Sequence, residues 1–308
     1  MKPARRLAHP SVQTAPPNAA KPDTHSVKSA ERVLTLLETI GAAPNGATFT
    51  ELHTGLGIPK SSLYALLEVL TARNYIESDP VSRRYVPGVR LWETGIAYHR
   101  HHGILKHAHA IMETIVHRVN ETVQFAKLAG GDNVYLAKVD STHALRLQSD
   151  VGARLSAHAT GIGKALLAEL DEREVRRRFP GERLQVYTRN TIANVSDLLD
   201  ELSVVRERGF AIDNEEYTTG VFCLAVPVFD GAGIASHALS VSVPTLRASR
   251  GGRAQILSAI AEGSAQISAG IGFSPSRSRL KSLSDPAAAG RQIDALIGSK
   301  RYRLSFVG

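Results

Sequence analysis

Apolar positions recur every three or four residues in the first third of the chain. This spacing predicts amphipathic helices over residues 29–40, 51–55 and 59–74, because it gathers the apolar side chains on one face. Two short stretches, 75–77 and 83–86, flank a Ser-Asp-Pro turn and predict a hairpin. Helix, turn, helix and hairpin in this order indicate a winged helix-turn-helix domain.

The exposed positions of this domain, residues 27–88, carry side chains that suit a DNA backbone. In such units the N-terminal end of the third helix enters the major groove, where N–H and hydroxyl groups hold phosphates. The hairpin adds cations for the backbone or the minor groove, although a solvated basic hairpin is the alternative. We expect the DNA-binding residues to be Lys60, Ser61, Ser62, Tyr64, Arg83 and Arg84.

The rest of the chain contains segments with helical spacing of apolar residues and segments in which apolar and polar residues alternate as in strands. Helices are expected over 89–102 and 104–119, and later over 196–208 and 253–271. The expected strands are 122–128, 133–139, 144–149, 210–213, 221–229 and 234–243. Strands interleaved with helices predict an α+β domain over 104–274, which a linker helix over 89–103 joins to the first domain.

The positive charge of the chain is concentrated at its two ends. The net charge of +8 divides into +4 for residues 1–102, −1 for 103–274 and +5 for 275–308. A basic first domain fits nucleic-acid binding. The Pro- and Ala-rich residues 1–26 indicate a disordered arm, and residues 275–308 indicate a basic, mostly disordered tail with a short helix over 291–297.

Composition excludes several classes of protein. The single cysteine, Cys223, excludes a disulfide framework and a CxxC-type zinc or redox site within one chain. We expect a cytoplasmic protein, because there is no apolar run of about 18 residues and no secretory signal. The histidines of residues 99–109 are spread around their helices without Cys or carboxylate partners, so no metal site is expected. Residues 152–170 superficially resemble a phosphate loop but lack GxxxxGK[ST], so no nucleotide cofactor is expected.

Several longer motifs resemble one known family. The first domain contains SAERVLTLLETI and FTELHTGLGIPKSSLYALLEVL, and the second contains GARLSAHATGIGKALLAEL, RERGFAIDNEEYTTGVFCLAVPVFDGAG and LSVSVP. With both sets in this order, residues 26–273 resemble the IclR family of bacterial transcriptional regulators. The resemblance implies a winged-helix DNA-binding domain, a linker helix and a GAF-like effector-binding domain. It also implies homodimers, often paired into homotetramers, that bind double-stranded operator DNA and respond to a small organic or aromatic acid.

The resemblance also implies where the effector binds. The corresponding residues are Gly161, Ile162, Asp213, Cys223, Ser240 and Ser242. A small carboxylate suits such a site, because N–H and hydroxyl donors would line a mostly apolar cleft. Asp213 would repel an anion unless it is protonated or bonded to a ligand hydroxyl, and the alternative is that it holds backbone. Cys223 is alternatively a buried apolar residue.

The sequence departs from the family pattern at three positions and in its basic C-terminal tail, which is longer than usual. Ala65 stands where many members carry Arg, Ile162 replaces a smaller residue, and Val243-Pro244 replaces Gly-Pro. Two other functions stay open as alternatives to a regulator. One is an enzyme that works through the Cys223 thiol, against which the absence of a paired nucleophile–base motif argues. The other is a structural DNA-binding dimer, against which the polar Ser240 and Ser242 within an apolar strand argue. We therefore expect a regulator and not an enzyme.

Overall fold

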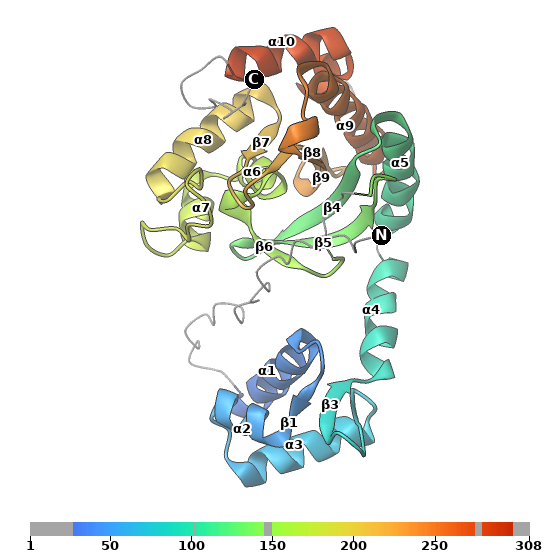
Figure 1. The fold of residues 1–308 in the computed structure, drawn as a ribbon, viewed down its shortest axis with the longest axis vertical. Helices are drawn as coiled ribbons and strands as arrows, with labels where there is room; N and C mark the ends of the chain where they lie inside the picture. Colours follow the sequence, from blue (N-terminus) through green and yellow to red (C-terminus); the bar gives the residue numbers. More distant parts are fainter. Residues whose placement is uncertain (1–26, 102, 145–149, 275–278, 298–308) are drawn as a thin grey trace, which may run out of the picture. The chain divides into compact units, whose positions relative to one another are not determined.

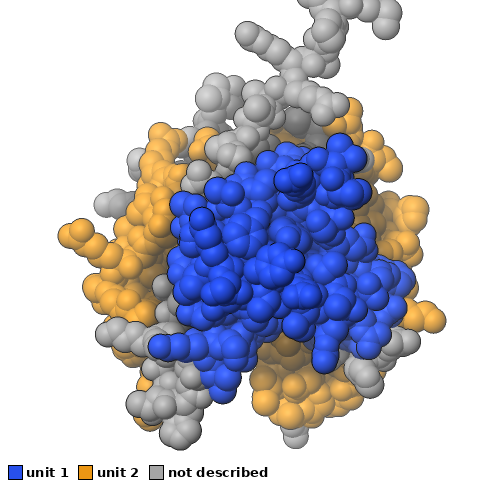
Figure 2. Space-filling view, turned by 90° about the horizontal axis from the view of Figure 1, so that it is seen from below, with its two compact units in different colours: residues 1–102 blue, residues 103–308 orange. Residues whose placement is uncertain are grey.

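The computed structural model describes residues 27–101, 103–144, 150–274 and 279–297. It divides the chain into two compact units, residues 1–102 and 103–308 (Figure 2). The arm expected over 1–26, and all but the first residue of the strand expected over 144–149, lie outside the described residues.

The first unit combines helices with a small antiparallel sheet (Figure 1). Its elements are α1 (Lys28–Ala42), β1 (Ala47–Thr48), α2 (Phe49–Leu56), α3 (Lys60–Ala72), β2 (Ile76–Ser78), β3 (Arg84–Pro87) and α4 (Val89–His101). The strand order is β1-β3-β2, so the predicted hairpin gains a third strand. Strand β1 is two residues long, which is too short for a periodic pattern to predict it.

The core of this unit confirms most of the predicted face of α3, since Leu63, Leu67 and Leu70 are buried. On α1 the spacing predicts that Leu34 and Ile40 face the core. Ile40 is buried as predicted, but Leu36 is buried and Leu34 is exposed. The sequence carries apolar residues at both positions, so helical spacing alone allows two overlapping stripes.

Helix α2 begins earlier than predicted, because Thr48 and not Thr50 caps it. The Glu51 N–H donates to the Thr48 hydroxyl over 3.2 Å, and the Thr48 N–H donates to the Glu51 carboxylate over 2.7 Å. This reciprocal pair is a capping box. The helix ends at Gly57, whose φ of 61° lies in the left-handed region that glycine adopts at low cost.

The second unit is built on one antiparallel sheet with helices on both faces (Figure 1). Its helices are α5 (Ile104–Val119), α6 (Gly161–Leu167), α7 (Glu172–Arg178), α8 (Val195–Arg208), α9 (Arg250–Gly270) and α10 (Pro286–Ile297). Its strands are β4 (Thr122–Ala129), β5 (Asp132–Val139), β6 (Arg154–Ser156), β7 (Ala211–Asn214), β8 (Val221–Phe229) and β9 (Ala235–Pro244), in the order β6-β5-β4-β9-β8-β7. The predicted α+β class is confirmed, and the likeness to GAF domains stays a prediction.

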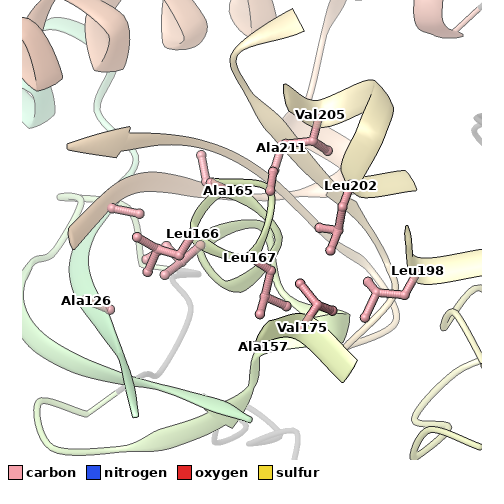
Figure 3. Packing of buried hydrophobic residues seen from close by; sticks show 14 of the residues in the cluster. Ala126, Ala157, Ala165, Leu166, Leu167, Val175, Leu198, Leu202, Val205 and Ala211 are labelled. Carbon is pink, nitrogen blue, oxygen red and sulfur yellow. The ribbon is translucent and has the colours of Figure 1, made fainter. Parts of the chain in front are cut away.

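The two faces of the sheet are covered by different helices. Helices α5 and α9 pack on one face, and α6 packs on the other, which we call the α6 face. Figure 3 shows the core on the α6 face, where Leu167 of α6 lies near Val175 of α7 and Leu198 of α8. Along each strand, side chains point alternately to the α6 face and to the opposite face, which α5 and α9 cover.

A β-bulge changes this alternation in β5. Phe125 of β4 pairs with Ala137, but the next residue, Ala126, pairs with Tyr135, so Leu136 is an extra residue. Directly paired residues share a face, and therefore the bulge places Tyr135 on the α6 face with Ala126. Tyr135 and Ala126 belong to the same buried cluster.

The C-terminal segment corrects the prediction of a mostly disordered tail. Residues Arg279–Ser284 form a 3-10 helix, and α10 follows it. Both pack against α9 and bury Leu280, Leu283, Ala289 and Ile293. Apolar residues are sparse in this Ser- and Ala-rich segment, so its composition resembles that of disordered chains although its few large side chains enter the core.

Candidate functional site

The N-terminal end of α3 presents the predicted DNA-binding residues on the surface. Lys60, Ser61 and Tyr64 are exposed, Tyr64 to 65%, and Ser62 is half-buried. The first turn of α3 contains no acidic residue. Helix N-termini carry partial positive charge, so this end of α3 suits phosphate.

The two arginines of the hairpin have different surroundings. Arg83 is exposed in the turn between β2 and β3, where its N–H donates to the Asp79 carbonyl over 2.8 Å. Arg84 points into the unit: its guanidinium donates to the Gly46 carbonyl over 2.9 Å and pairs with Glu51 at 3.2 Å. Arg84 therefore connects β3 to the capping box of α2, and Arg83 is the hairpin arginine that faces solvent.

The predicted effector residues of β7, β8 and β9 form a continuous row across the sheet. Asp213 pairs with Cys223, and Cys223 pairs with Ser242, so the three side chains share the α6 face. Cys223 Sγ lies 3.1 Å from the Ser242 hydroxyl oxygen. All three residues are buried.

The two predicted serines converge on a residue that the sequence did not indicate. The Ser240 hydroxyl donates to Gln124 Oε1 over 3.0 Å, and the Ser242 hydroxyl donates to the same atom over 2.8 Å. Gln124 is buried on β4 directly opposite Ser240. The acceptor that holds both serine hydroxyls lies on the neighbouring strand. It can be identified from the strand register but not from the spacing of residues in the sequence.

Gly161 and Ile162 begin α6 above this row. A Cβ on Gly161 would lie 3.4 Å from the Ala225 Cβ and 3.6 Å from the Cys223 Cβ, so this backbone packs closely on β8. Ile162 is buried in the apolar cluster of the α6 face. The structure therefore brings all six predicted effector residues to one side of the sheet.

Buried charges surround Asp213. Its carboxylate accepts a hydrogen bond from the Glu216 N–H over 2.7 Å, so it does hold backbone. Burial, and next the Glu216 charge, raise the pKa of Asp213 to about 7. Burial also raises the pKa of Glu216, whose carboxylate forms an ion pair with Lys164. Neither Lys164 nor Glu216 was predicted from the sequence as a neighbour of the site.

The thiol of Cys223 is unsuited to nucleophilic chemistry. Burial, and next the charge of Asp213, raise the pKa of Cys223 well above its usual range. A thiolate is the reactive form of cysteine, and activated cysteines have a lowered pKa. These surroundings weigh against the alternative of an enzyme that works through Cys223.

Strand β5 contributes two further polar residues to the α6 face. Asn133 and Tyr135 are buried there, and Asn133 Oδ1 accepts a hydrogen bond from the Thr160 hydroxyl over 2.7 Å. The Thr160 hydroxyl in turn accepts from the Gly163 N–H over 3.2 Å and caps α6. Only the bulge in β5 places Tyr135 on this face, so no alternating pattern could have found it.

Within the described residues, no group of three or more His, Cys, Asp or Glu side chains could hold a metal ion. No described helix is long and apolar enough to cross a membrane.

Two family models match the chain. The model of the bacterial transcriptional regulator IclR C-terminal domain covers residues 96–269, and the IclR helix-turn-helix model covers residues 29–80. The chain is 32% identical to the HTH-type transcriptional regulator BhcR of Paracoccus denitrificans, over 81% of this chain and 89% of that protein. It is 31% identical to the transcriptional repressor IclR of Escherichia coli, over 80% of this chain and 88% of that protein.

Solved structures share the fold. The Thermotoga maritima IclR structure superposes with a TM-score of 0.63 at 28% identity, covering 80% of this chain and 99% of that one. An IclR homologue from Microbacterium hydrocarbonoxydans, crystallised with 4-hydroxybenzoate, superposes with a TM-score of 0.69 at 21% identity. It covers 79% of this chain and 98% of the other, and shows the fold alone.

Proposed function

This chain belongs to the IclR family of bacterial transcriptional regulators, and we propose that it binds operator DNA as a dimer under the control of a small organic acid. The observation that carries this proposal is that one unit exposes the N-terminal end of α3 and the other unit buries a row of polar residues. A symmetric dimer, alone or within a tetramer, places two copies of α3 on two half-sites. Acid binding then shifts the population between DNA-competent and incompetent arrangements.

On the DNA side, we assign contacts to the exposed end of α3 and to the tip of the hairpin. Lys60, Ser61, Ser62 and Tyr64 lie in or beside the first turn of α3, and Arg83 is the exposed cation of the hairpin. Arg84 acts indirectly in this proposal, because its contacts with Gly46 and Glu51 hold the hairpin against α2. Ala65 is also exposed on α3 but offers no polar group to a base.

On the effector side, the proposal uses the polar row between α6 and the sheet. Buried polar groups in an otherwise apolar site are typical of small-molecule recognition. The relative from Microbacterium hydrocarbonoxydans, which shares this fold, was crystallised with an aromatic hydroxy acid. A coupling of about 1–3 kcal/mol between acid and operator would change DNA affinity about 5- to 150-fold. The protein acts without catalysis in this proposal, and it acts in the cytoplasm, where the operator is.

The DNA assignment is tested by the salt dependence of operator binding. We expect Lys60→Ala to weaken binding to every DNA sequence and to lower the slope of log K against log salt by about one. Arg173→Ala is the matched control, since Arg173 is an exposed cation on α7. An unchanged slope in Lys60→Ala would show that Lys60 does not contact a phosphate.

The effector assignment is tested by a double substitution, Ser240→Ala with Ser242→Ala. We expect this variant to bind operator DNA with wild-type affinity and to lose its response to the acid. Fluorescence anisotropy of labelled operator, titrated with acid, measures both properties. A normal response would show that the acid binds elsewhere.

A further inference from the structure

The effector site contains two groups of polar side chains that differ in what they offer a ligand. The first is the serine group, Gln124, Ser240 and Ser242. Both serine protons are directed to Gln124 Oε1, at 3.0 and 2.8 Å. A hydroxyl whose proton is engaged still has lone pairs, so the serine oxygens act as acceptors. An ionised carboxylate is itself only an acceptor. It therefore cannot accept a hydrogen bond from serines whose protons are already donated to Gln124.

The second is the amide group, Asn133, Tyr135 and Thr160. Thr160 donates its proton to Asn133 Oδ1 over 2.7 Å while its own oxygen accepts from the Gly163 N–H. This contact fixes which way the Asn133 amide faces. Asn133 is 0% exposed, and within the described residues its Nδ2 has no partner at hydrogen-bonding distance, although the Asn133 side chain acts on the Tyr135 hydroxyl and lowers its pKa. A buried donor without a partner costs free energy, so this amide suits an acceptor supplied by a ligand.

Tyr135 lies on the same face of the sheet as the predicted effector residues. The Tyr135 ring shares an apolar cluster with Ala126, Ala225 and Ala238, whose small side chains lie on three successive strands. Burial raises the pKa of Tyr135, and the charges of Cys223 and Asp213 raise it further. The hydroxyl therefore keeps its proton at neutral pH, and Tyr135 lies on the face of the sheet that also carries Cys223 and Asp213.

These two groups have opposite hydrogen-bonding characters and meet on one face of the sheet. We propose that Asn133 and Tyr135 bind the carboxylate of the effector, and that the Ser240 oxygen and the Asp213 carboxylate accept a hydrogen bond from a hydroxyl of the same molecule. The effector class is then a hydroxy acid. This inference rests on the proposed function, and it reverses the expectation that the serines donate to the carboxylate.

The test is calorimetric titration of the full-length protein with matched pairs of acids. Lactate is compared with propionate, and 4-hydroxybenzoate with benzoate, because each pair differs by one hydroxyl. We expect the wild type to bind the hydroxy acid of at least one pair about tenfold more tightly than its partner. Tyr135→Phe should weaken both members of that pair by the same factor, about 10- to 100-fold, because it removes a bond to their common carboxylate. Ser240→Ala should weaken only the hydroxy acid.

Two further variants guard against indirect effects. Asn133→Asp keeps the acceptor for Thr160 but replaces the donor, and it should weaken both acids as Tyr135→Phe does. Tyr85→Phe is the matched control, because Tyr85 packs against the apolar core of the first unit, whereas the serine and amide groups belong to the second. It should bind both acids as the wild type does. Melting temperatures of all variants confirm that each is folded.

Each contrary result has a separate meaning. If Tyr135→Phe and Asn133→Asp bind both acids as tightly as the wild type, while Ser240→Ala weakens both equally, the carboxylate lies at the serines and this proposal is overturned. If the wild type binds none of the four acids, this proposal is overturned. Control of operator binding by an acid is tested separately by the anisotropy titration, so the two failures are distinguished.

Discussion

The Lys164 ammonium and the Glu216 carboxylate form an ion pair that is almost completely buried, with side-chain exposures of 1% and 6%. Lys164 lies on α6, and Glu216 follows β7. The pair therefore connects the helix above the polar row to the strand that carries Asp213. Taking two charges out of water is costly, so the pair is stable only while both partners are present.

The cost of breaking this ion pair can be measured. We expect Lys164→Met to lower the free energy of unfolding by about 3–5 kcal/mol, because it leaves the Glu216 charge buried without a partner. The double variant Lys164→Met with Glu216→Gln should recover much of this loss, because no buried charge is left. Urea unfolding of the four members of this cycle provides the test. Losses that simply add in the double variant would contradict the account.

The buried carboxyl of Asp213 makes stability depend on pH. The pKa of Asp213 rises from its usual 3.8 to about 7 in the folded protein. Between these values the folded state holds a proton that the unfolded state has released. Stability should therefore fall as pH rises through this window, by at most about 1.4 kcal/mol per pH unit from this group.

The variant Asp213→Asn isolates this contribution. Its free energy of unfolding relative to the wild type should increase from pH 5 to pH 7 and stay level from pH 8 to pH 9. Denaturant unfolding at fixed pH values measures the difference. A constant difference from pH 5 to pH 7 would mean that Asp213 is ionised in the folded state throughout.

The two hairpin arginines should behave differently when their charges are removed. Arg83→Asn should lower the salt slope of operator binding by about one, and asparagine tolerates the φ of 54° at this position. Arg84→Met should lower the stability of the first unit by about 1 kcal/mol, because it loses the bonds to Gly46 and Glu51. Anisotropy and thermal unfolding of both variants provide the comparison. A larger change in salt slope for Arg84→Met would place Arg84 on the DNA.

The C-terminal segment should contribute to the stability of the second unit. Leu283 is 0% exposed against α9, whereas Leu246 is 98% exposed. We expect Leu283→Ala to cost about 2–5 kcal/mol and Leu246→Ala to cost less than about 0.5 kcal/mol. Urea unfolding of both variants tests this. Equal, small effects would indicate that the segment is disordered, as its composition predicts.

Long periodic segments were predictable from the sequence, and short or irregular ones were not. The helix predicted over 104–119 has those bounds in α5, and the strand predicted over 221–229 has those bounds in β8. Both are long enough for one pattern to dominate. Strand β1 is too short for this. The sequence also predicts Ser196 as the N-cap of the helix over 196–208, but Asn194 caps α8, because either residue can cap a helix.

The candidate effector site was predictable only in part, for a related reason. Its six predicted residues came from motifs that resemble a family, and they do lie together on the α6 face. Gln124, Asn133 and Tyr135 join them through strand register and a β-bulge, which no single stretch of sequence encodes. Lys164 lies within the segment 152–170 that superficially resembles a phosphate loop, but its pairing with Glu216 depends on a contact between residues far apart in the chain.

The central claim is that this protein is a regulator that recognises specific operator DNA. The most direct measurement is selection of bound fragments from the genomic DNA of its own organism, followed by sequencing and footprinting. The account predicts enrichment of a palindromic or repeated site upstream of a small set of genes. Recovery of DNA without a common site, with binding lost as salt rises, would contradict it.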